Sequence, residues 1–215
     1  MPAIRVSCFR GFTSDALNSS GQGGSSQHAY IASMAAYVGV DPRKDINWVV
    51  YLGAQAIQLL AEGKIDALIG FPPEPQQMRA QKIGHVIVNT ASDRPWSEYF
   101  CCMVTGNREF IRKYPIATKR ATRAILKARS VCELEPQRAA QVMVDRGYRT
   151  TYDLALQTLK EIPFGKWRVL DPEDTVRFFA LRLREADMIK SSPQQIISQG
   201  TDWRFVNELK KELKG

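Results

Sequence analysis

The 215-residue sequence lacks any uninterrupted apolar run of the roughly 20 residues that a membrane-spanning helix needs. Its opening residues, Met1 to Cys8, lack the apolar stretch of a secretory signal, so we expect no export of the chain as written. It contains no Ser/His/Asp order, no H-E-x-x-H and no P-loop, and its two histidines, His28 and His85, stand in no metal or base motif. These absences argue against a catalytic protein and predict that no cofactor and no metal is required.

Cysteine is also scarce. Cys8, Cys101, Cys102 and Cys132 show no Cys-x-x-Cys or Cys/His spacing, which excludes the usual zinc patterns. We interpret them as small apolar residues buried on strands. The cysteines therefore do not indicate a redox compartment.

Acidic residues are outnumbered by basic ones, 22 against 30, which gives a formal net charge of +8 and a pI near 9.4. A basic protein can bind nucleic acid, an anionic membrane or an anionic small ligand. The sequence has no long basic run, however, and its densest stretch, 119–123, spaces its charges as a solvated helix face would. We therefore expect solvated helix surfaces and no nucleic-acid partner.

The first part of the chain divides into an irregular segment, 1–23, and an α/β region, 24–105. Ile4 to Phe9 has the composition of a strand, but the residues from Arg10 to Gly24 are rich in Gly, Ser, Asn and Gln. Beyond them, short apolar runs alternate with helical periodicity, which predicts a mostly parallel sheet with helices on its faces. The strands expected there are Ile46 to Tyr51, Ile65 to Phe71, His85 to Asn89 and Tyr99 to Val104; the helices begin at Ser25 or Ser26, at Ala54 and at Pro73.

The remaining segment, 106–215, has the apolar spacing of successive helices. We expect Pro115 to halt the first helix and Asp171-Pro172 to start a later one. The expected helices are Arg108 to Lys113, Ala117 to Cys132, Pro136 to Arg146, Thr151 to Glu161, Val176 to Ala186, a short one from Ser192-Pro193, and Asp202 to Leu213.

Three motifs carry a resemblance to a known family. They are Gly-Ser-Ser-Gln-His at 24–28 followed by Met-Ala-Ala-Tyr-Val-Gly-Val-Asp-Pro at 34–42, Leu-Ala-Glu-Gly-Lys-Ile-Asp-Ala at 60–67, and Asp-Trp-Arg-Phe-Val-Asn-Glu-Leu-Lys at 202–210. In this order and spacing the sequence resembles the nitrate/sulfonate/taurine/bicarbonate group of ABC-transporter solute-binding proteins.

The resemblance implies a type II periplasmic-binding-protein fold, with two α/β lobes and a ligand cleft between them. Family members carry a further α/β segment before the Gly-Ser-Ser motif, and residues 1–23 do not resemble it. We therefore expect one largely complete lobe, lobe two, at 24–105, and helices at 106–215 that return to lobe one. The apolar faces of Val176 to Leu183 and Phe205 to Leu213 would then lack strands to cover, which predicts self-association or disorder of the C-terminal helices. The alternative is that Ile4 to Phe9 pairs with the sheet and partly replaces the missing strands.

The Ser25-Ser26-Gln27 turn is the strongest candidate for ligand contact. A helix start offers unpaired backbone N–H groups and the positive end of a dipole, and two hydroxyls add donors. Such a turn suits an oxyanion such as sulfonate or nitrate, although simple N-capping explains the serines equally well without the family context.

Four further residues are candidate ligand contacts. Gln55 opens the second helix of the α/β region, and Phe71 and Glu74 follow an expected strand at its carboxyl end, where open α/β sheets bind ligands. Phe71 suits stacking or core packing, and Glu74 suits accepting from an amine or fixing its loop. Tyr99, like the nearby Trp96, suits either hinge packing or a cleft wall.

The sequence thus favours a binding protein over an enzyme. The resemblance implies an ABC importer component in the periplasm that binds a small, anionic solute and contacts the membrane subunits of the transporter. Two alternatives share the fold: an enzyme like those that make the pyrimidine precursor of thiamine, and the effector-sensing domain of a LysR-type regulator. The first needs a reactive histidine and a cysteine cluster, and the second needs an N-terminal helix-turn-helix.

Overall fold

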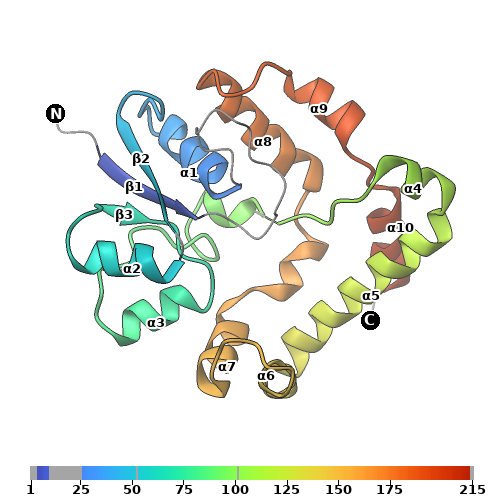
Figure 1. Cartoon of the computed structure of the whole chain (residues 1–215). Helices are drawn as coiled ribbons and strands as arrows, with labels where there is room; N and C mark the ends of the chain where they lie inside the picture. The colour runs from blue at the N-terminus through green and yellow to red at the C-terminus, as the bar shows by residue number, and fades with distance from the viewer. Residues whose placement is uncertain (1–3, 10–25, 52, 101, 214–215) are drawn as a thin grey trace. The chain divides into compact units, whose positions relative to one another are not determined.

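A computed structural model describes residues 4–9, 26–51, 53–100 and 102–213 (Figure 1). The chain divides into two compact units. The first unit comprises Met1–Ile87 and Val176–Gln199, and the second comprises Val88–Thr175 and Gly200–Gly215. Each unit is thus assembled from two stretches of sequence.

A three-stranded parallel sheet forms the centre of the first unit. Its strand order is β2-β1-β3, so β1 hydrogen-bonds to both neighbours. The register pairs Ile4 with Ile46 and Phe9 with Tyr51 along β2, and Val6 with Ala67 along β3. The elements of this part are β1 (Ile4–Phe9), α1 (Ser26–Tyr37), β2 (Ile46–Tyr51), α2 (Gly53–Ala61), β3 (Ala67–Leu68) and α3 (Glu74–Ala80).

Connections through α1 and α2 run in opposite directions across this sheet. The connection through α1 leads from β1 to β2, and the connection through α2 leads from β2 past β1 to β3. Because crossovers between parallel strands are right-handed, connections that run in opposite directions place their helices on opposite faces of the sheet. On the α1 face, Ala35 and Ile46 form a small core with Ile31 and Trp48 against it. On α2, Ala56 is completely buried. Gly63, with a φ of +67°, turns the chain after α2 in a conformation that glycine adopts without strain.

The α/β region differs from expectation at its strands. The strand composition of Ile4 to Phe9 is confirmed, and this strand is the central one of a sheet although the segment 1–23 was expected to be irregular. The other residues of that segment lie outside the described residues. The expected strand from Ile65 to Phe71 shortens to Ala67–Leu68. The described residues of 85–89 and 99–104 form no strand. Apolar runs of this length in a connecting segment resemble buried strands by periodicity alone.

Two C-terminal helices complete the first unit. They are α8 (Pro172–Glu185), which belongs to this unit from Val176, and most of α9 (Pro193–Gly200). Phe179 of α8 packs against Tyr30 of α1 with ring centroids 5.2 Å apart, and Phe178 lies 5.8 Å from Tyr37. Arg43 and Asp187 form an ion pair at 3.2 Å. Residues 176–199 therefore pack on the same unit as α1, and not with the rest of the expected C-terminal segment.

The second unit consists of helices among its described residues. They are the 3₁₀ helix η1 (Trp96–Glu98), α4 (Arg108–Lys113), α5 (Pro115–Leu134), α6 (Pro136–Asp145), α7 (Tyr152–Glu161), the 3₁₀ helix η2 (Phe164–Arg168) and α10 (Arg204–Glu212). Pro115 begins α5, where it was expected to separate two helices. Proline suits a first helical position because its missing N–H would find no intrahelical partner there.

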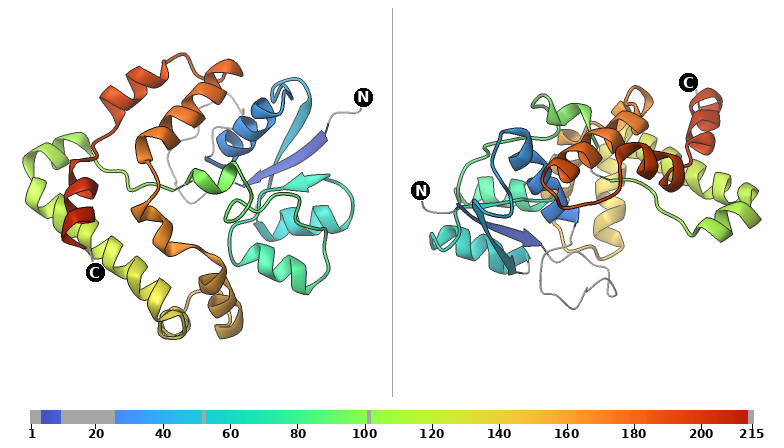
Figure 2. Two further views of the ribbon diagram at one scale, coloured as in Figure 1. Left: turned by 180° about the vertical axis from the view of Figure 1, so that it is seen from behind. Right: turned by 90° about the horizontal axis from the view of Figure 1, so that it is seen from above.

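Two clusters form the core of the second unit. Leu126, Trp167 and Leu209 bring α5, η2 and α10 together, and Ala140, Ala155 and Leu159 join α6 to α7. Figure 2 shows α6 beside α7 and α10 beside α5, and both pairs are in contact.

The apolar faces that were expected to lack partners are covered. Val176 and Ala180 of α8 are buried, and so are Phe205 and Leu209 of α10. The premise on which self-association was predicted is therefore wrong for these two helices, because α8 packs on α1 and α10 packs on α5. Self-association itself stays a prediction.

The cysteine interpretation is wrong for Cys102 and Cys132, whereas Cys8 does lie on a strand, β1. Cys132 lies on α5 and is half-buried, and Cys102 is exposed and lies in no strand. Burial raises the pKa of the Cys132 thiol, which favours its uncharged form.

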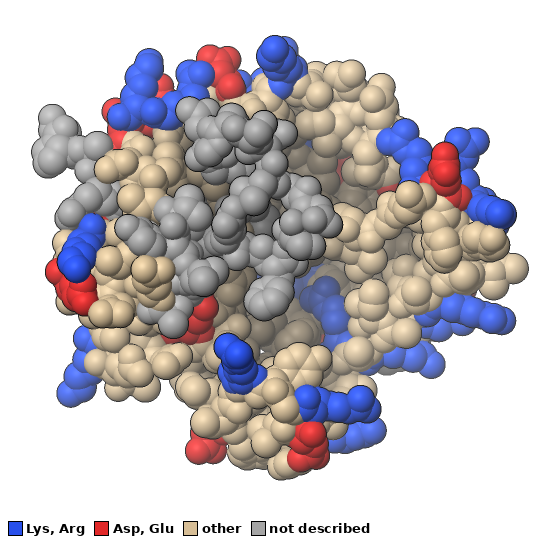
Figure 3. Space-filling model, viewed as in Figure 1, with Lys and Arg blue, Asp and Glu red and all other residues tan. Residues whose placement is uncertain are grey.

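Charged side chains lie on the surface in mixed groups. On the face shown in Figure 3, the Lys and Arg side chains are distributed mostly around the margin in several separate groups, and Asp or Glu side chains lie beside some of these groups. Lys64 pairs with Glu62 at 2.7 Å, and Lys119 pairs with both Glu208 and Glu212 at 2.6 Å. No helix within the described ranges is long and apolar enough to cross a membrane.

The architecture is thus α/β with more helix than strand, as expected in outline. The three-part division at 1–23, 24–105 and 106–215 remains a prediction about lobes, and the compact units divide the chain after Ile87.

Candidate functional site

The candidate residues of the first unit lie at one edge of its sheet. Because β1, β2 and β3 are parallel, their carboxyl ends meet at the same edge, and each is followed by a segment that leads into a helix. We call the ends of these strands, with the starts of α1, α2 and α3, the carboxyl edge. Ser26 and Gln27 begin α1, Gln55 lies in the first turn of α2, and Phe71 and Glu74 follow β3.

Strand order marks one place on this edge. From β1 the chain continues to β2, its neighbour on one side, whereas β3 is its neighbour on the other side. The connections that follow β1 and β3 therefore leave the sheet in different directions, and the switch point lies between these two strands. Open α/β sheets bind ligands at such switch points, outside the carboxyl ends of the strands. The segment with Phe71 and Glu74 and the start of α1 each follow one of these two strands. Ser25 lies outside the described residues, as does the side chain of Ser26.

The turn after β3 is held by its own hydrogen bonds. The backbone N–H of Phe71 donates to Oε2 of Glu74 at 3.2 Å, and the backbone N–H of Glu74 donates to the carbonyl oxygen of Phe71 at 2.9 Å. This reciprocal pair fixes the entry into α3. Of the two roles considered for Glu74, fixing its loop is the one that these contacts support.

Glu74 is partly buried, and burial raises the pKa of its carboxyl group above the ordinary value, with a smaller opposing effect from the Phe71 N–H. A carboxylate at an anion site would repel the ligand. Burial of Glu74 favours the uncharged form of its carboxyl group, whereas the hydrogen bond from the Phe71 N–H favours the charged form.

Gly70 is a residue of this turn that sequence reasoning missed. A Cβ at position 70 would lie 2.9 Å from Cγ of Pro75, closer than real Cβ atoms approach. Glycine therefore lets the chain pass directly against the first turn of α3. The glycine in Gly70-Phe71-Pro72-Pro73 was a signal for this close approach.

His28 packs within the first unit. Its ring lies edge-on to Trp48 of β2 with centroids 4.3 Å apart, and burial lowers the pKa of the imidazole. Trp48 in turn donates from Nε1 to the carbonyl oxygen of Pro42 at 2.6 Å. His28 is thus favoured in its neutral form. Among the described residues no group of His, Cys, Asp and Glu has the arrangement of a metal site.

Tyr99 belongs to the second unit. It follows η1 and is half-buried, while the neighbouring Trp96 is 7% exposed, which supports core packing for Trp96. The structure therefore does not bring Tyr99 into one unit with the candidates at the carboxyl edge.

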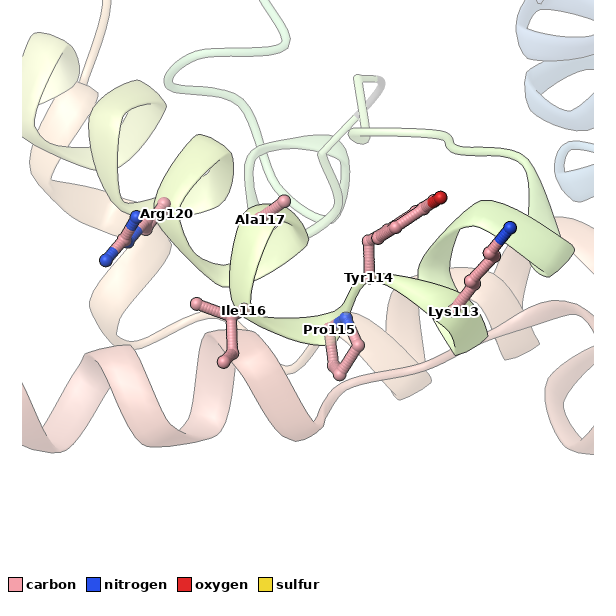
Figure 4. Close-up of a pocket in the computed structure, with 6 residues that line it drawn as sticks. All are labelled: Lys113, Tyr114, Pro115, Ile116, Ala117 and Arg120. Carbon is pink, nitrogen blue, oxygen red and sulfur yellow. The ribbon is translucent and has the colours of Figure 1, made fainter.

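A surface hollow of about 500 Å³ lies at the corner between α4 and α5 (Figure 4). Lys113 and Tyr114 point to one side of the chain there, and Pro115 and Ile116 point to the other; Arg120 lies farther along α5. Because these side chains diverge, the corner lacks the convergent polar groups of a small-molecule site.

Comparison with known proteins decides the family. The sequence model of the NMT1-like family matches residues 19–145, which is more than half of the chain. The chain belongs to the NMT1-like family. The match includes α1, β2, α2 and α3, and hence most of the described carboxyl edge.

Two curated relatives carry a more specific name. Both are bicarbonate-binding proteins CmpA, one from Synechococcus elongatus strain PCC 7942 and one from Synechococcus sp. strain PCC 6301, and they are 26% and 25% identical to this chain. Each alignment covers 156 residues, or 72% of this chain and 34% of the relative, so the chain spans about a third of the length of these relatives. No solved structure matches the chain. The resemblance to the nitrate/sulfonate/bicarbonate group of solute-binding proteins is confirmed.

Proposed function

We propose that this chain is the solute-binding component, or part of it, of an ABC importer, and that it binds a small anion such as bicarbonate, nitrate or a sulfonate at the carboxyl edge. Two observations together support the proposal. The chain belongs to a family whose curated relatives are named for binding bicarbonate. Its parallel sheet also directs three helix starts to one edge.

The physical case for an anion rests on backbone donors. The first four N–H groups of an α-helix have no intrahelical acceptor, and the aligned peptide dipoles place partial positive charge at that end. Both α1, with 12 residues, and α2, with 9, begin at this edge, and neither has an acidic residue in its first turn. Gln27 and Gln55 add side-chain amides, which donate to oxyanions without adding charge.

The wider assembly follows from the same proposal. We expect the first unit to supply one wall of a type II binding-protein cleft, and Tyr99 in the second unit stays a candidate ligand contact. The membrane subunits of the transporter are the expected partners, and the expected location is outside the cytoplasmic membrane. Binding without turnover is expected because the residues that the structure describes at the carboxyl edge supply donors but no paired acid and base.

Isothermal titration calorimetry with bicarbonate, nitrate, methanesulfonate and taurine tests the proposal. The double variant Ser25→Ala/Ser26→Ala should bind the preferred anion more weakly by about 1–3 kcal/mol, because each lost donor leaves a ligand oxygen poorly satisfied. That loss corresponds to roughly a 5- to 150-fold increase in Kd.

Ser191→Ala/Ser192→Ala is the matched control, because it also removes a serine pair that precedes a helix. Ser192 Oγ accepts from the backbone N–H of Gln195 at 3.1 Å, so this variant loses a cap without touching the carboxyl edge. It should lower thermal stability and leave Kd unchanged. Equal loss of affinity in both double variants, or turnover of a bound solute, would contradict the proposal.

A further inference from the structure

A second hollow lies in the second unit, on the surface formed where α5 ends, α6 begins and α7 leads into η2. Its volume is about 550 Å³. Most of the residues around it are apolar: Pro136, Leu159, Ile162, Pro163, Phe164 and Val169. Val169 is 82% exposed, so an apolar wall of this hollow is open to solvent.

Several polar groups near the hollow are already engaged. Lys166 donates from Nζ to the carbonyl oxygens of Ala91 and Ser97 at 3.1 and 3.4 Å. The carbonyl oxygen of Phe164 accepts from Nη2 of Arg129 at 2.9 Å. These contacts hold η2 in place and leave two other charged residues, Glu133 and Lys160, with free hydrogen-bonding capacity.

Glu133 carries the available negative charge. Its carboxylate forms no hydrogen bond with the described part of the chain, and its ion pair with Arg168 is long, at 3.8 Å. The carboxylate lies directly on Gly165, where a Cβ would come within 2.3 Å of Oε1. Glycine at this position therefore leaves the space that Glu133 occupies beside the hollow.

Lys160 carries the available positive charge. It lies in the last turn of α7, is exposed, and pairs with no acidic group among the residues that the structure describes. Glu133 on α5 and Lys160 on α7 both line the same hollow. The lining thus combines a carboxylate whose ion pair within the described ranges is the long one to Arg168, an ammonium group without an acidic partner in those ranges, and an apolar surface.

We infer that this hollow binds a small zwitterion with an apolar body, whose ammonium group pairs with Glu133 and whose carboxylate pairs with Lys160. The apolar body contacts Leu159, Ile162 and Val169, which removes water from around both ion pairs and strengthens them. Linear ω-amino acids have this chemistry. The site lies wholly in the second unit, so it is independent of the anion site proposed at the carboxyl edge.

Titration of the isotope-labelled chain with 4-aminobutanoate, 6-aminohexanoate and 8-aminooctanoate, followed by amide chemical shifts, tests the inference. The probe whose length matches the two charges should bind with a Kd of about 1 mM, as expected for an open hollow. The largest shifts should occur at 133–136 and 159–169. Hexylamine and hexanoate, which each lack one charge, should bind at least about threefold more weakly.

Two variants complete the test. Glu133→Gln and Lys160→Met should each raise Kd for the best zwitterion about three- to tenfold, and each should abolish its advantage over the probe lacking the corresponding charge. Glu109→Gln and Lys127→Met, which alter exposed charges outside the hollow, should have no effect. The inference would be overturned if hexylamine or hexanoate bound as tightly as every zwitterion. It would also be overturned if no amide at 133–136 or 159–169 shifted at a zwitterion concentration about 50 times the expected Kd of about 1 mM.

Discussion

The two units differ in how far apart in the sequence their contacting elements lie. In the second unit, α6 packs on α7, which follows it directly, and α5 leads straight into α6. In the first unit, the sheet joins β1 at residues 4–9 to β2 and β3, and α1 packs on α8 some 140 residues later. The comparison teaches that local sequence signals specify the second unit, whereas the first depends on distant pairing and on close approaches of the backbone.

The largest expected effect is in the second unit, where α10 packs against α5 from the far end of the sequence. Leu209 of α10 is completely buried beside Leu126 and Trp167. Leu209→Ala should lower the free energy of unfolding by about 2–5 kcal/mol, because it removes buried methyl groups and leaves a cavity. Urea denaturation measures the change.

Leu134→Ala is the control for that variant, because Leu134 is 77% exposed at the end of α5. It should change the unfolding free energy by less than about 0.5 kcal/mol. Similar values for the two leucines would show that α10 is not docked on α5 as described.

An intermediate effect is expected in the first unit, at Gly70. Gly70→Ala places a Cβ 2.9 Å from Pro75 Cγ, and either the Pro75 ring or the backbone must shift to relieve the overlap. The expected cost is about 1–3 kcal/mol in the same denaturation experiment. Gly200→Ala, where a Cβ meets no atom within 4 Å, should be neutral or slightly stabilising. The comparison between the units weakens if Gly70 tolerates alanine as well as Gly200 does.

The smallest effects concern two carboxyl groups with opposite pKa shifts. Lys119 and Arg123 lower the pKa of Glu212 in the second unit, so its contribution to stability is present above the ordinary carboxyl pKa and is lost as pH falls through the lowered value. Glu212→Gln should therefore lower Tm slightly at pH 7, should lower it less at acid pH, and should lose its effect in high salt.

Glu74 in the first unit has the reverse sign. Its pKa is raised by burial, so stability falls as pH rises from the ordinary carboxyl pKa to the raised one, and the penalty persists above it. Gln keeps an oxygen that accepts from the Phe71 N–H. Glu74→Gln should thus leave Tm at pH 7 unchanged or slightly higher, as differential scanning calorimetry across pH 3 to 8 will show.

Sequence patterns predicted the helices of the second unit closely. Asn107 caps α4 by accepting from the Phe110 N–H at 3.0 Å, and Thr151 caps α7 by accepting from the Leu154 N–H at 3.3 Å. Such caps depend on residues three positions apart, so the sequence displays them directly. Pro115 was expected to halt the helix at 108–113, and α4 does end at Lys113; Pro115 also begins α5, two residues before the expected start at Ala117.

The strands were predicted less well because pairing decides them. Ile4–Phe9 looked isolated beside a Gly- and Ser-rich stretch, and its central position became evident only from its pairing with Ile46–Tyr51. The apolar runs at 85–89 and 99–104 had strand composition but form no described strand. Composition alone cannot distinguish a strand from an apolar connection.

In the candidate site, likewise, local patterns predicted positions along the chain, whereas contacts between distant atoms were not predicted. Gln55 was selected because it opens a helix, and Phe71 and Glu74 because they follow an expected strand; parallel pairing places all three at the carboxyl edge, and their contact with a ligand stays a prediction. The bond from Phe71 to Glu74 and the contact between Gly70 and Pro75 depend on three-dimensional proximity, which the spacing of residues did not determine.

Amide chemical-shift mapping with the anion preferred in calorimetry tests the central claim most directly. We predict saturable shifts at the starts of α1 and α2 and at 69–74, with little change at the opposite edge of the sheet, around Ile4 and Ile46. Shifts concentrated at the opposite edge or in the second unit would contradict the assignment of the carboxyl edge as the binding site.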